Sequence, residues 1–383
     1  MRVAFYAPLK PPDHPVPSGD RRIARLLIRA LRDGGHAVDV AARLRSRDGA
    51  GDRNRQRRIR DAGRRIAARL IARHRHDPPD LWFTYHLYHK APDWIGPAVA
   101  AALSIPYVVA EASHAAKQAD GAWRDGHRAS AAAIAAARRL LVFDPLDLPG
   151  VAEIAAPERL VRMPPFLDIA DRQPPRAAAR DAIARAHGLD PGRPWLATVA
   201  MMRADIKRES YRVLAAALAR LGDRPWSLLV AGDGIARPEV EALFDSVPDR
   251  QNRVRFLGAL DRPALVRLHA ATDLAVWPAL DEGFSMALLE AQAAGVPVAA
   301  GDRLGIAQYV RHGETGLLAP EGDATALAAA ARALLADPAR RRMMGDRARL
   351  RIRAHHGLPA AARMLTAALN DACRDEVRRE ARP

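Results

Sequence analysis

Short apolar runs alternate with helical segments along almost the whole chain. In the first half the runs lie at 3–6, 38–41, 81–84, 106–110 and 140–143. A run followed by a helix and a second run forms a βαβ unit, and such units build parallel sheets. The alternation therefore predicts an α/β fold of the Rossmann-like, doubly wound kind.

Helices are expected between these runs. Ser18 or Asp20 can cap the first one, because the apolar residues that follow recur at helical spacing as far as Gly34. Two further helices are expected at 91–103 and 129–137. In such folds ligands bind beyond the carboxyl ends of the strands, so the loops that follow the strands are the candidate sites.

The same alternation restarts after a segment rich in proline, at 164–194, which also contains a helical stretch at 176–187. The chain has 383 residues, which suggests two domains rather than one core. We predict an N-terminal Rossmann-like domain at 1–170 and a C-terminal one at 190–356. A last helix at 357–383 could pack back on the first domain. Strands of the second half are expected at 195–200, 227–231, 254–257, 274–277 and 296–300, and helices from residue 324 onward.

Several classes of protein are disfavoured by the sequence. Neither half has a Gly-x-Gly-x-x-Gly after its first strand, which argues against a nicotinamide or flavin enzyme. Cys373 is the single cysteine, so an intrachain disulfide is excluded, and no Cys/His cluster indicates zinc. The apolar stretch at the start is too short for a signal peptide, and no run of 18 apolar residues occurs. We expect a cytoplasmic protein.

The formal charge of +16 favours anionic partners, from nucleotides to acidic lipids and glycans. Between Arg43 and Arg75 there are thirteen arginines against three aspartates, and Ile59, Ile66 and Leu70 form one helical stripe among them. The stretch is either a solvated helix packed by its stripe, or a peripheral contact with an anionic membrane or acidic acceptor. Without interleaved aromatics or zinc-finger spacing, no nucleic acid partner is expected.

The segment from Trp277 to Glu290 carries the clearest chemistry. An apolar run ends, the chain turns at Gly283, and a helix is expected from about Ser285. The free N–H groups of a helix N-terminus attract phosphate. Glu290, further along that helix, could accept hydrogen bonds from vicinal hydroxyls such as those of a ribose, and Glu282 could contact a sugar. The alternative is an ordinary helix with two solvent-facing glutamates.

Continued through Val298, this segment resembles the E-x(7)-E signature of glycosyltransferase family 4, with Glu282 and Glu290 as its glutamates. Other segments match in order. Asp233–Gly234 is similar to the family's G-x-G turn, 255–258 to its V-x-F-L-G strand, 312–318 to its G-x-x-G-L-L hairpin and 337–345 to its helical tail. The resemblance covers almost the entire chain and is sharper after residue 195.

This resemblance implies a GT-B fold, two Rossmann-like lobes facing across a cleft, with the donor bound mainly by the second. It also implies retention of anomeric configuration, no metal and no cofactor other than the nucleoside-diphosphate sugar as co-substrate. Arg203 and Lys207 match the family's R-x(4–5)-K pair, which clamps the donor phosphates by charge-assisted contacts. The expected donor-binding residues are Gly19, Gly258, Gly283, Phe284, Ser285, Met286 and Glu290.

The chain departs from the family pattern at three glycines, which are Met202, Arg208 and Ser285 here. Met202 leaves less room for close backbone approach, whereas Ser285 could cap the helix or bind a phosphate. No departure removes a charged group, so we expect an active protein.

The resemblance is thinner in the first half. Gly19 lies where the family has a glycine-rich turn near the donor phosphate, although it could equally be a plain turn glycine ahead of a helix. His114 follows the strand at 106–110, where family members place a histidine facing the transferred sugar; a lone histidine is more often structural. With Arg203, Lys207 and Glu282, His114 completes the expected catalytic set.

We therefore expect a metal-independent, retaining glycosyltransferase of the hexosyltransferase type, which transfers a sugar to a glycan or lipid-linked hydroxyl in envelope or exopolysaccharide synthesis. Two alternatives remain: a GT-B-fold sugar-nucleotide epimerase or hydrolase, and a non-catalytic basic protein that binds anions with steep salt dependence. A peripheral location at the inner face of the membrane is expected if the arginine-rich stretch binds lipid.

Overall fold

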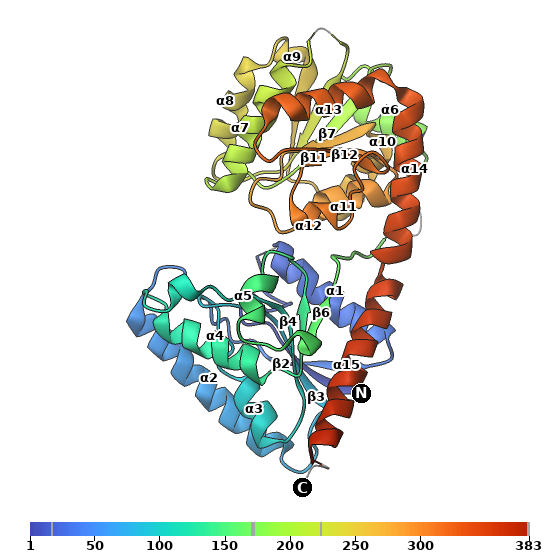
Figure 1. The fold of residues 1–383 in the computed structure, drawn as a ribbon. Coiled ribbons are helices and arrows are strands. Elements are labelled where there is room, and N and C mark those ends of the chain that lie inside the picture. Colours follow the sequence, from blue (N-terminus) through green and yellow to red (C-terminus); the bar gives the residue numbers. More distant parts are fainter. Residues whose placement is uncertain (17, 170–172, 223, 381–383) are drawn as a thin grey trace. The chain divides into compact units, whose positions relative to one another are not determined.

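The computed structural model describes residues 1–16, 18–169, 173–222 and 224–380, with side chains as far as residue 374 (Figure 1). The chain forms two compact units, Met1–Pro164 with Leu358–Pro383 (unit 1) and Pro165–Gly357 (unit 2). Residues 170–172 of the predicted interdomain connection lie outside the described residues.

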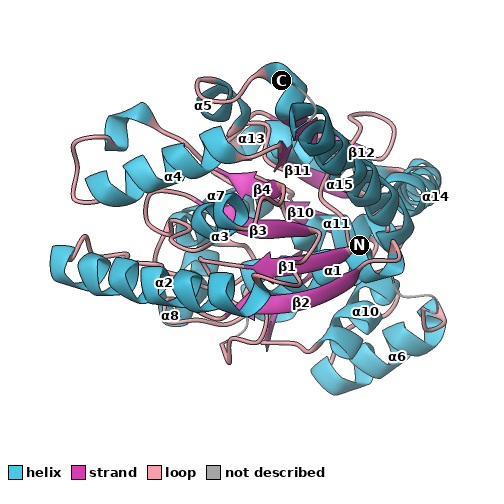
Figure 2. Cartoon of the chain, turned by 90° about the horizontal axis from the view of Figure 1, so that it is seen from below, coloured by secondary structure: helices cyan, strands magenta, loops and turns pink. Residues whose placement is uncertain are grey.

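Unit 1 contains a parallel sheet of six strands with the order β2-β1-β3-β4-β5-β6. Figure 2 shows β1 between β2 and β3. α1 and α15 pack together on one face, and α2, α3 and α4 form the layer on the other. The strands are β1 (Arg2–Tyr6), β2 (Ala37–Ala42), β3 (Leu81–Leu87), β4 (Tyr107–Ala112), β5 (Arg139–Val142) and β6 (Leu160–Arg162). The helices are α1 (Gly19–Asp33), α2 (Arg53–His74), α3 (Gly96–Ala102), α4 (Arg124–Ala136), α5 (Leu148–Ala152) and α15 (Leu358–Glu380), with 3-10 turns at Ala116–Gln118 and Pro157–Arg159.

Unit 2 repeats the architecture with the strand order β12-β11-β10-β7-β8-β9, again parallel. Its strands are β7 (Trp195–Val199), β8 (Ser227–Ala231), β9 (Val254–Gly258), β10 (Leu274–Trp277), β11 (Val298–Gly301) and β12 (Gly316–Ala319). Its helices are α6 (Arg176–His187), α7 (Ile206–Ala219), α8 (Arg237–Leu243), α9 (Arg250–Arg253), α10 (Arg262–Ala271), α11 (Met286–Ala293), α12 (Leu304–Ala307), α13 (Ala324–Ala336) and α14 (Pro338–His355), with a 3-10 turn at Phe244–Ser246. The predicted doubly wound α/β architecture is confirmed.

The first helix begins where the sequence places it. The Ser18 side chain accepts a hydrogen bond from the Arg21 N–H at 3.2 Å, so Ser18, rather than Asp20, is the cap. Buried apolar residues then recur on one side of the helix as far as Leu31. Gly19 is consequently the first residue of α1, and the expectation of a loop glycine there is wrong by one position.

The helix predicted at 91–103 is shorter in the structure, because the buried Asp93 delays its start. One carboxylate oxygen of Asp93 accepts the N–H groups of Ile95 and Gly96 at 2.8 and 2.7 Å, and the other accepts hydroxyls from Thr84 and Tyr107. Four hydrogen bonds satisfy this enclosed carboxylate, so α3 begins only at Gly96.

Two edge strands, β6 and β12, were not predicted. The segment 312–318, which resembles a hairpin in sequence, forms a turn at Gly313 (φ 80°) that leads into β12. β12 then pairs in parallel with β11. The prediction of a hairpin at 312–318 is therefore wrong. The glycine turn leads instead into β12, the last strand at the edge of the sheet.

The C-terminal helices are interrupted twice. α13 ends before Asp337, whose side chain caps α14, and α14 gives way to α15 at residues 356–357. α15 belongs to unit 1, where it packs along α1. Of the helices that the structure describes, none is at once long and apolar enough to cross a membrane.

Candidate donor site in unit 2

The predicted strand, loop and helix around Glu282 are present as β10, residues 278–285 and α11. The loop is tightly shaped, since Ala279 and Asp281 adopt left-handed backbone with φ of 54° and 46°. Its Gly283 carbonyl lies against Gly305, where a Cβ would come within 1.2 Å of the oxygen. This close approach fixes the path of the chain into α11.

Ser285 stands at the N-cap position of α11, but its side chain caps nothing. Its backbone is held instead by the Tyr309 hydroxyl, which accepts the Ser285 N–H and donates to the Ser285 carbonyl, both at 3.1 Å. The expectation that Ser285 caps the helix is therefore wrong. Phe284 and Met286, on either side, are partly buried against the core of unit 2.

Lys207 and Glu282 are brought together by the topology of the sheet. The Lys207 ammonium forms an ion pair with Oε1 of Glu282, and the Trp277 indole N–H donates to the same oxygen at 3.2 Å. Both charged side chains are largely buried, 18% exposed for Lys207 and 7% for Glu282. The second oxygen, Oε2 of Glu282, is enclosed and has no hydrogen-bond partner among the described residues. We refer to these three residues as the Lys207 cluster.

The ammonium of Lys207 is readily deprotonated for a lysine. Burial, assisted by the nearby Arg203 cation, lowers the pKa of Lys207 to about 8, while Asp205 acts in the opposite direction. Lys207 lies in the first turn of α7, and its backbone N–H is capped by Asp205 at 2.9 Å. The helix start thus fixes the position of the ammonium group.

Arg203 lies in the loop after β7 and is about half exposed. It pairs with Asp205 at 3.0 Å. The two predicted phosphate-binding cations therefore lie near one another, but Lys207 is enclosed by Glu282 and Trp277, whereas Arg203 lies at the surface.

The loop that carries Arg203 packs against a glycine turn after β8. A Cβ on Gly232 would lie 1.8 Å from the carbonyl oxygen of Ala200, and one on Gly234 2.2 Å from that of Met202. Only glycine fits at these positions, both of which have positive φ. Met202 itself is fully buried, so its side chain is accommodated in the core, although the family that the sequence resembles has glycine at this position.

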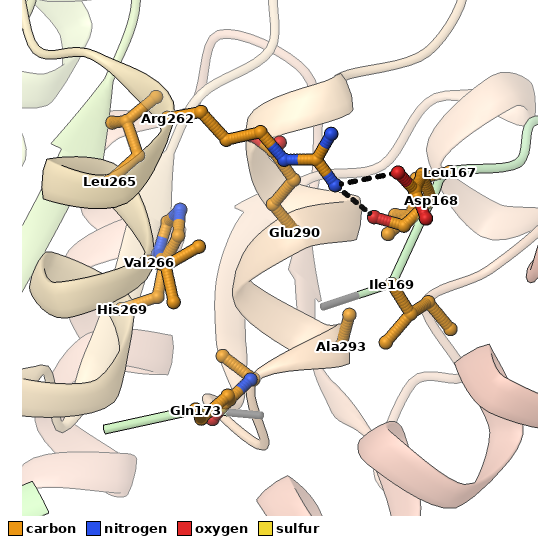
Figure 3. Close-up of a pocket in the computed structure, with 11 residues that line it drawn as sticks. Leu167, Asp168, Ile169, Gln173, Arg262, Leu265, Val266, His269, Glu290 and Ala293 are labelled. Carbon is orange, nitrogen blue, oxygen red and sulfur yellow. Dashed lines mark hydrogen bonds and ion pairs between the residues drawn. The ribbon is translucent and has the colours of Figure 1, made fainter. Parts of the chain in front are cut away.

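Glu290 lies further along α11, beside a pocket that is separate from the Lys207 cluster. This cavity of about 40 Å³, which we call the α10 pocket, is lined by Glu290 and by Arg262, Val266 and His269 of α10, with Asp168 on the opposite wall (Figure 3). The Arg262 guanidinium reaches across it and bonds to the Asp168 carbonyl at 2.6 Å and carboxylate at 3.2 Å. Gly258, at the end of β9 with φ 70°, does not line the pocket.

His114 and Gly19 belong to unit 1. The His114 ring lies tilted against the His127 ring with centroids 4.7 Å apart, and its Nε2 lies 3.8 Å from Glu153. Burial, together with the charge of His127, lowers the pKa of His114. A Cβ on Gly19 would meet no atom within 4 Å, so packing does not require glycine there. The roles expected of both residues remain predictions.

One polar cluster in unit 1 was not predicted as a site. It lies at the carboxyl ends of β3 and β4 and contains Asp20, His86 and Glu111, with His86 Nδ1 3.1 Å from the Asp20 carboxylate. His86 and Glu111 both have left-handed backbone, with φ of 62°. Residue types give no signal for this conformation, although the position of both residues at strand ends could have drawn attention to them.

Among the described residues, no group of three or more histidine, cysteine, aspartate or glutamate side chains could hold a metal ion.

Comparison with known proteins finds a family that the second half of the chain is similar to. Residues 193–337 match the family model of the glycosyl transferases group 1. A D-inositol 3-phosphate glycosyltransferase of Nocardia farcinica is 36% identical over 198 residues, which are 50% of this chain and 43% of that protein. The match thus spans less than half the length of this relative.

Two solved structures share the fold of the whole chain. Sucrose-phosphate synthase from Thermosynechococcus elongatus superimposes with a TM-score of 0.75 at 22% identity, over 98% of this chain and 100% of that one. The Anabaena protein HepE, solved in complex with UDP-glucose, gives a TM-score of 0.70 at 16% identity over 97% and 99% of the two chains. The α/β fold is that of the GT-B glycosyltransferases, and the part of unit 2 at residues 193–337 is similar to the group 1 glycosyltransferases.

Proposed function

We propose that the chain transfers a sugar from a nucleoside-diphosphate sugar to a hydroxyl acceptor, and that unit 2 binds the donor. The observation that supports this best is the Lys207 cluster. It places a buried cation beside the loop that enters α11, at the carboxyl ends of the adjacent strands β7 and β10. Open parallel sheets bind their ligands at this edge.

The chemistry of the leaving group needs positive charge. When the bond between sugar and diphosphate breaks, negative charge grows on the diphosphate oxygens, and preorganised cations stabilise it. A helix N-terminus such as that of α11 supplies only about half an elementary charge. Lys207 and Arg203 would supply the rest, Lys207 from a fixed, largely buried position and Arg203 by exchanging Asp205 for a phosphate oxygen.

The carboxylates complete the donor site in this proposal. A donor phosphate would compete with Glu282 for the Lys207 ammonium, and the enclosed Oε2 of Glu282 could accept a hydrogen bond from a hydroxyl of the transferred sugar. Glu290, on α11 and beside the α10 pocket, would bind the hydroxyls of the ribose. Backbone groups near Gly258 would contact the base.

The acceptor is the finer part of the proposal. The Nocardia relative is named for D-inositol 3-phosphate, an anionic polyol, and the charge of +16 suits such an acceptor or an acidic lipid-linked glycan. An envelope or exopolysaccharide pathway would supply acceptors of this kind.

α2 supports a peripheral contact with an anionic membrane. Gly63, Ala67 and Leu70 are buried toward the rest of unit 1, and Ile66 packs against the same core, so Ile66 and Leu70 of the predicted stripe face inward, while Ile59 is half-buried. The arginines of the other face are exposed: Arg53, Arg55, Arg57, Arg58, Arg64, Arg65, Arg69 and Arg73. A stably packed helix with a cationic outer face can bind acidic lipid headgroups without inserting.

The test is a panel of nucleotide sugars that begins with UDP-glucose. Each is first scored by the rise in melting temperature, since a ligand at 100 times its Kd adds about 2.7 kcal/mol of stability. Release of the nucleoside diphosphate is then followed with and without D-inositol 3-phosphate and simple glycosides. Transfer to an acceptor supports the proposal. Release that no acceptor changes would indicate a hydrolase or epimerase instead. Binding without preference among sugars and with steep salt dependence would indicate a non-catalytic anion-binding protein.

A further inference from the structure

A stripe of arginines runs along one flank of α2, beside the buried side of the helix. Arg53, Arg57 and Arg60 follow one another at intervals of four and three residues, so their side chains leave the helix in nearly the same direction. Like charges at this spacing repel one another and destabilise a helix. An anion bound between these side chains would remove the repulsion.

The arginine stripe forms one wall of a cavity of about 240 Å³ in unit 1. The other wall is the loop before α4 with the first residues of that helix, namely Gly121, Ala122, Arg124 and Asp125. The side-chain amide of Gln56 ties the two walls together, because it donates to the Ala122 carbonyl at 3.1 Å. α2 and the start of α4 thus lie side by side (Figure 1).

The loop of the second wall is firmly attached to unit 1. The Trp123 indole N–H donates to the Asp48 carbonyl at 2.8 Å, and the Lys90 ammonium lies 4.4 Å from the centroid of the Trp123 ring. A Cβ on Gly51 would come within 2.7 Å of the Cβ of Ala122, so the loop approaches the start of α2 closely. The cavity is therefore a built feature of the fold, not a chance gap between side chains.

The lining of the cavity carries an excess of positive charge. Four guanidinium groups line it against a single carboxylate, that of Asp125. Asp125 pairs only loosely, at 3.6 Å from Arg60 and 3.8 Å from Arg124. Two other nearby carboxylates are engaged elsewhere, since Asp52 caps α2 and Asp48 accepts a side-chain amide. The charge of the arginine stripe is thus only partly balanced within the protein.

Arg60 is poorly satisfied in this position. Its side chain is only 27% exposed, and its Nε is shielded from solvent and has no hydrogen-bond partner among the described residues. The ion pair that Nε forms with Asp61 spans 3.5 Å. A guanidinium group offers five N–H donors in a planar fork that matches the oxygens of a phosphate. A phosphate oxygen in the cavity would supply the acceptor that Arg60 lacks.

We propose that this cavity, which we call the α2 pocket, binds a phosphomonoester through Arg53, Arg57 and Arg60. Pockets for drug-sized ligands enclose about 300–1,000 Å³, so the α2 pocket suits a small phosphorylated group such as glycerol phosphate. A phosphomonoester carries about 1.5–2 negative charges at neutral pH. It would displace Asp125, whose side chain is 52% exposed and can turn into solvent.

The α2 pocket lies within unit 1, and its ligand does not depend on the proposed transfer reaction. The phosphomonoester has two possible sources, a free metabolite or the headgroup of a lipid. Both present the same dianionic group to the arginine stripe, so the experiment has one arm for each source.

The first arm is a calorimetric titration with glycerol 3-phosphate at pH 7.5 and low salt. It compares native protein, Arg53→Gln/Arg57→Gln and the matched control Arg65→Gln/Arg69→Gln. Arg65 and Arg69 are exposed arginines of α2 that do not line the pocket, so the control removes the same charge from the same helix. Native and control proteins should bind with a similar Kd. The Kd of Arg53→Gln/Arg57→Gln should be higher by about tenfold or more, as expected when charge-assisted hydrogen bonds are lost.

The second arm uses vesicles to identify the source of the phosphate. Phosphatidic acid presents a phosphomonoester and phosphatidylserine a phosphodiester, so vesicles of the two lipids are compared at equal surface charge. A preference for phosphatidic acid that the control retains and Arg53→Gln/Arg57→Gln loses would identify a lipid headgroup as the ligand. Binding of glycerol 3-phosphate without a preference between the vesicles would identify a free phosphomonoester.

The proposal is overturned if native protein binds neither glycerol 3-phosphate nor phosphatidic acid in a saturable way. Equal weakening in the two double variants would overturn it as well, because bulk charge would then explain the binding. Undiminished binding by Arg53→Gln/Arg57→Gln would place the ligand elsewhere, for example at the Lys207 cluster. Thermal unfolding without ligand should give both variants the melting temperature of native protein. A marked loss in Arg53→Gln/Arg57→Gln alone would assign the stripe to folding instead of binding.

Discussion

The ammonium group of Lys207, in the first turn of α7, is paired with the carboxylate of Glu282, in a loop 75 positions further along the chain. The contact exists because β7 and β10 are neighbours in the sheet and their carboxyl ends meet. Trp277, the last residue of β10, donates to the same carboxylate and lies under the ammonium, 5.5 Å from it to the ring centroid. One cluster thus links the predicted phosphate-binding cation to the predicted sugar-binding carboxylate.

Binding of UDP should depend on the protonation of Lys207. The pKa of this group is lowered to about 8, so the ammonium is charged at pH 7 and neutral well above pH 8. A diphosphate binds the charged form, so the Kd of UDP should rise about tenfold per pH unit above that value. Calorimetric titration at pH 7, 8 and 9 measures this. A Lys207→Met variant should bind weakly with little pH dependence, and an equally steep slope in that variant would exclude Lys207 as the group concerned.

Glu290→Gln should weaken donor binding more than it harms folding. A paired hydrogen bond to a charged group contributes about 1.5–3 kcal/mol, which corresponds to a Kd higher by roughly 10- to 100-fold. Glu290 lines the α10 pocket and lies outside the Lys207 cluster, so the melting temperature of the free protein should change little. UDP titration and thermal unfolding of the same samples measure both effects. Unchanged UDP affinity would remove Glu290 from the site.

The exposed face of α2 should bind anionic vesicles at low salt. Replacing Arg58, Arg65 and Arg69 with glutamine should weaken that binding, since each basic residue near such a surface contributes about 1 kcal/mol. The matched control replaces Arg342, Arg347 and Arg353, three exposed arginines of α14, and removes the same charge. Sedimentation with phosphatidylserine vesicles measures binding. Equal losses in both triple variants would indicate bulk charge, and no binding by native protein would make α2 a solvated face.

The stability of the protein should respond to Glu111 with a definite sign. Its pKa is raised in the folded state, so the folded protein holds this proton more tightly than the unfolded chain. The stability associated with the proton is complete below about pH 4.5 and is lost as the pH rises toward 8. At pH 9, the free energy of unfolding of Glu111→Gln should therefore exceed that of native protein by at least about 1 kcal/mol, and the variant should melt at a higher temperature. At pH 5 the two melting temperatures should be similar. If Glu111→Gln is less stable than native protein at pH 9, the ionised carboxylate of Glu111 is stabilised by its surroundings in the folded protein, contrary to this prediction.

The fold was predictable because its signals are local. Apolar runs and helical spacing placed the strands β7, β8 and β10 within a residue of their observed ends, and Ser18 was recognisable as a cap. The edge strand β6 was missed because it has only three residues and none of them is buried, and β12 was missed because the glycine turn before it resembles a hairpin in sequence. The late start of α3 depends on four hydrogen bonds to Asp93. Two of them come from Thr84 on β3 and Tyr107 on β4, and a local sequence pattern cannot predict such contacts between elements.

The candidate site was predictable only in part. The spacing of Glu282 and Glu290 and the place of Lys207 after a strand identified the residues, but not the ion pair, which follows from the order of strands in the sheet. Of the two roles offered for Ser285, capping α11 and binding a phosphate, the structure does not show the first, because Tyr309, 24 positions further on, holds the Ser285 backbone instead. Glu111 was passed over because left-handed backbone and an enclosed, unpaired oxygen arise only in the folded protein.

The central claim is that Lys207 stabilises the leaving diphosphate without the help of a metal ion. The most direct measurement is the initial rate of UDP release from UDP-glucose in excess EDTA, for native protein, Lys207→Ala and the control Arg208→Ala, whose side chain pairs with Glu239 at the surface. Native and control proteins should keep their full rates in EDTA, and Lys207→Ala should lose roughly 100- to 1000-fold, as is typical for one preorganised group. A native rate abolished by EDTA and restored by magnesium, or near-native turnover in Lys207→Ala, would contradict the account.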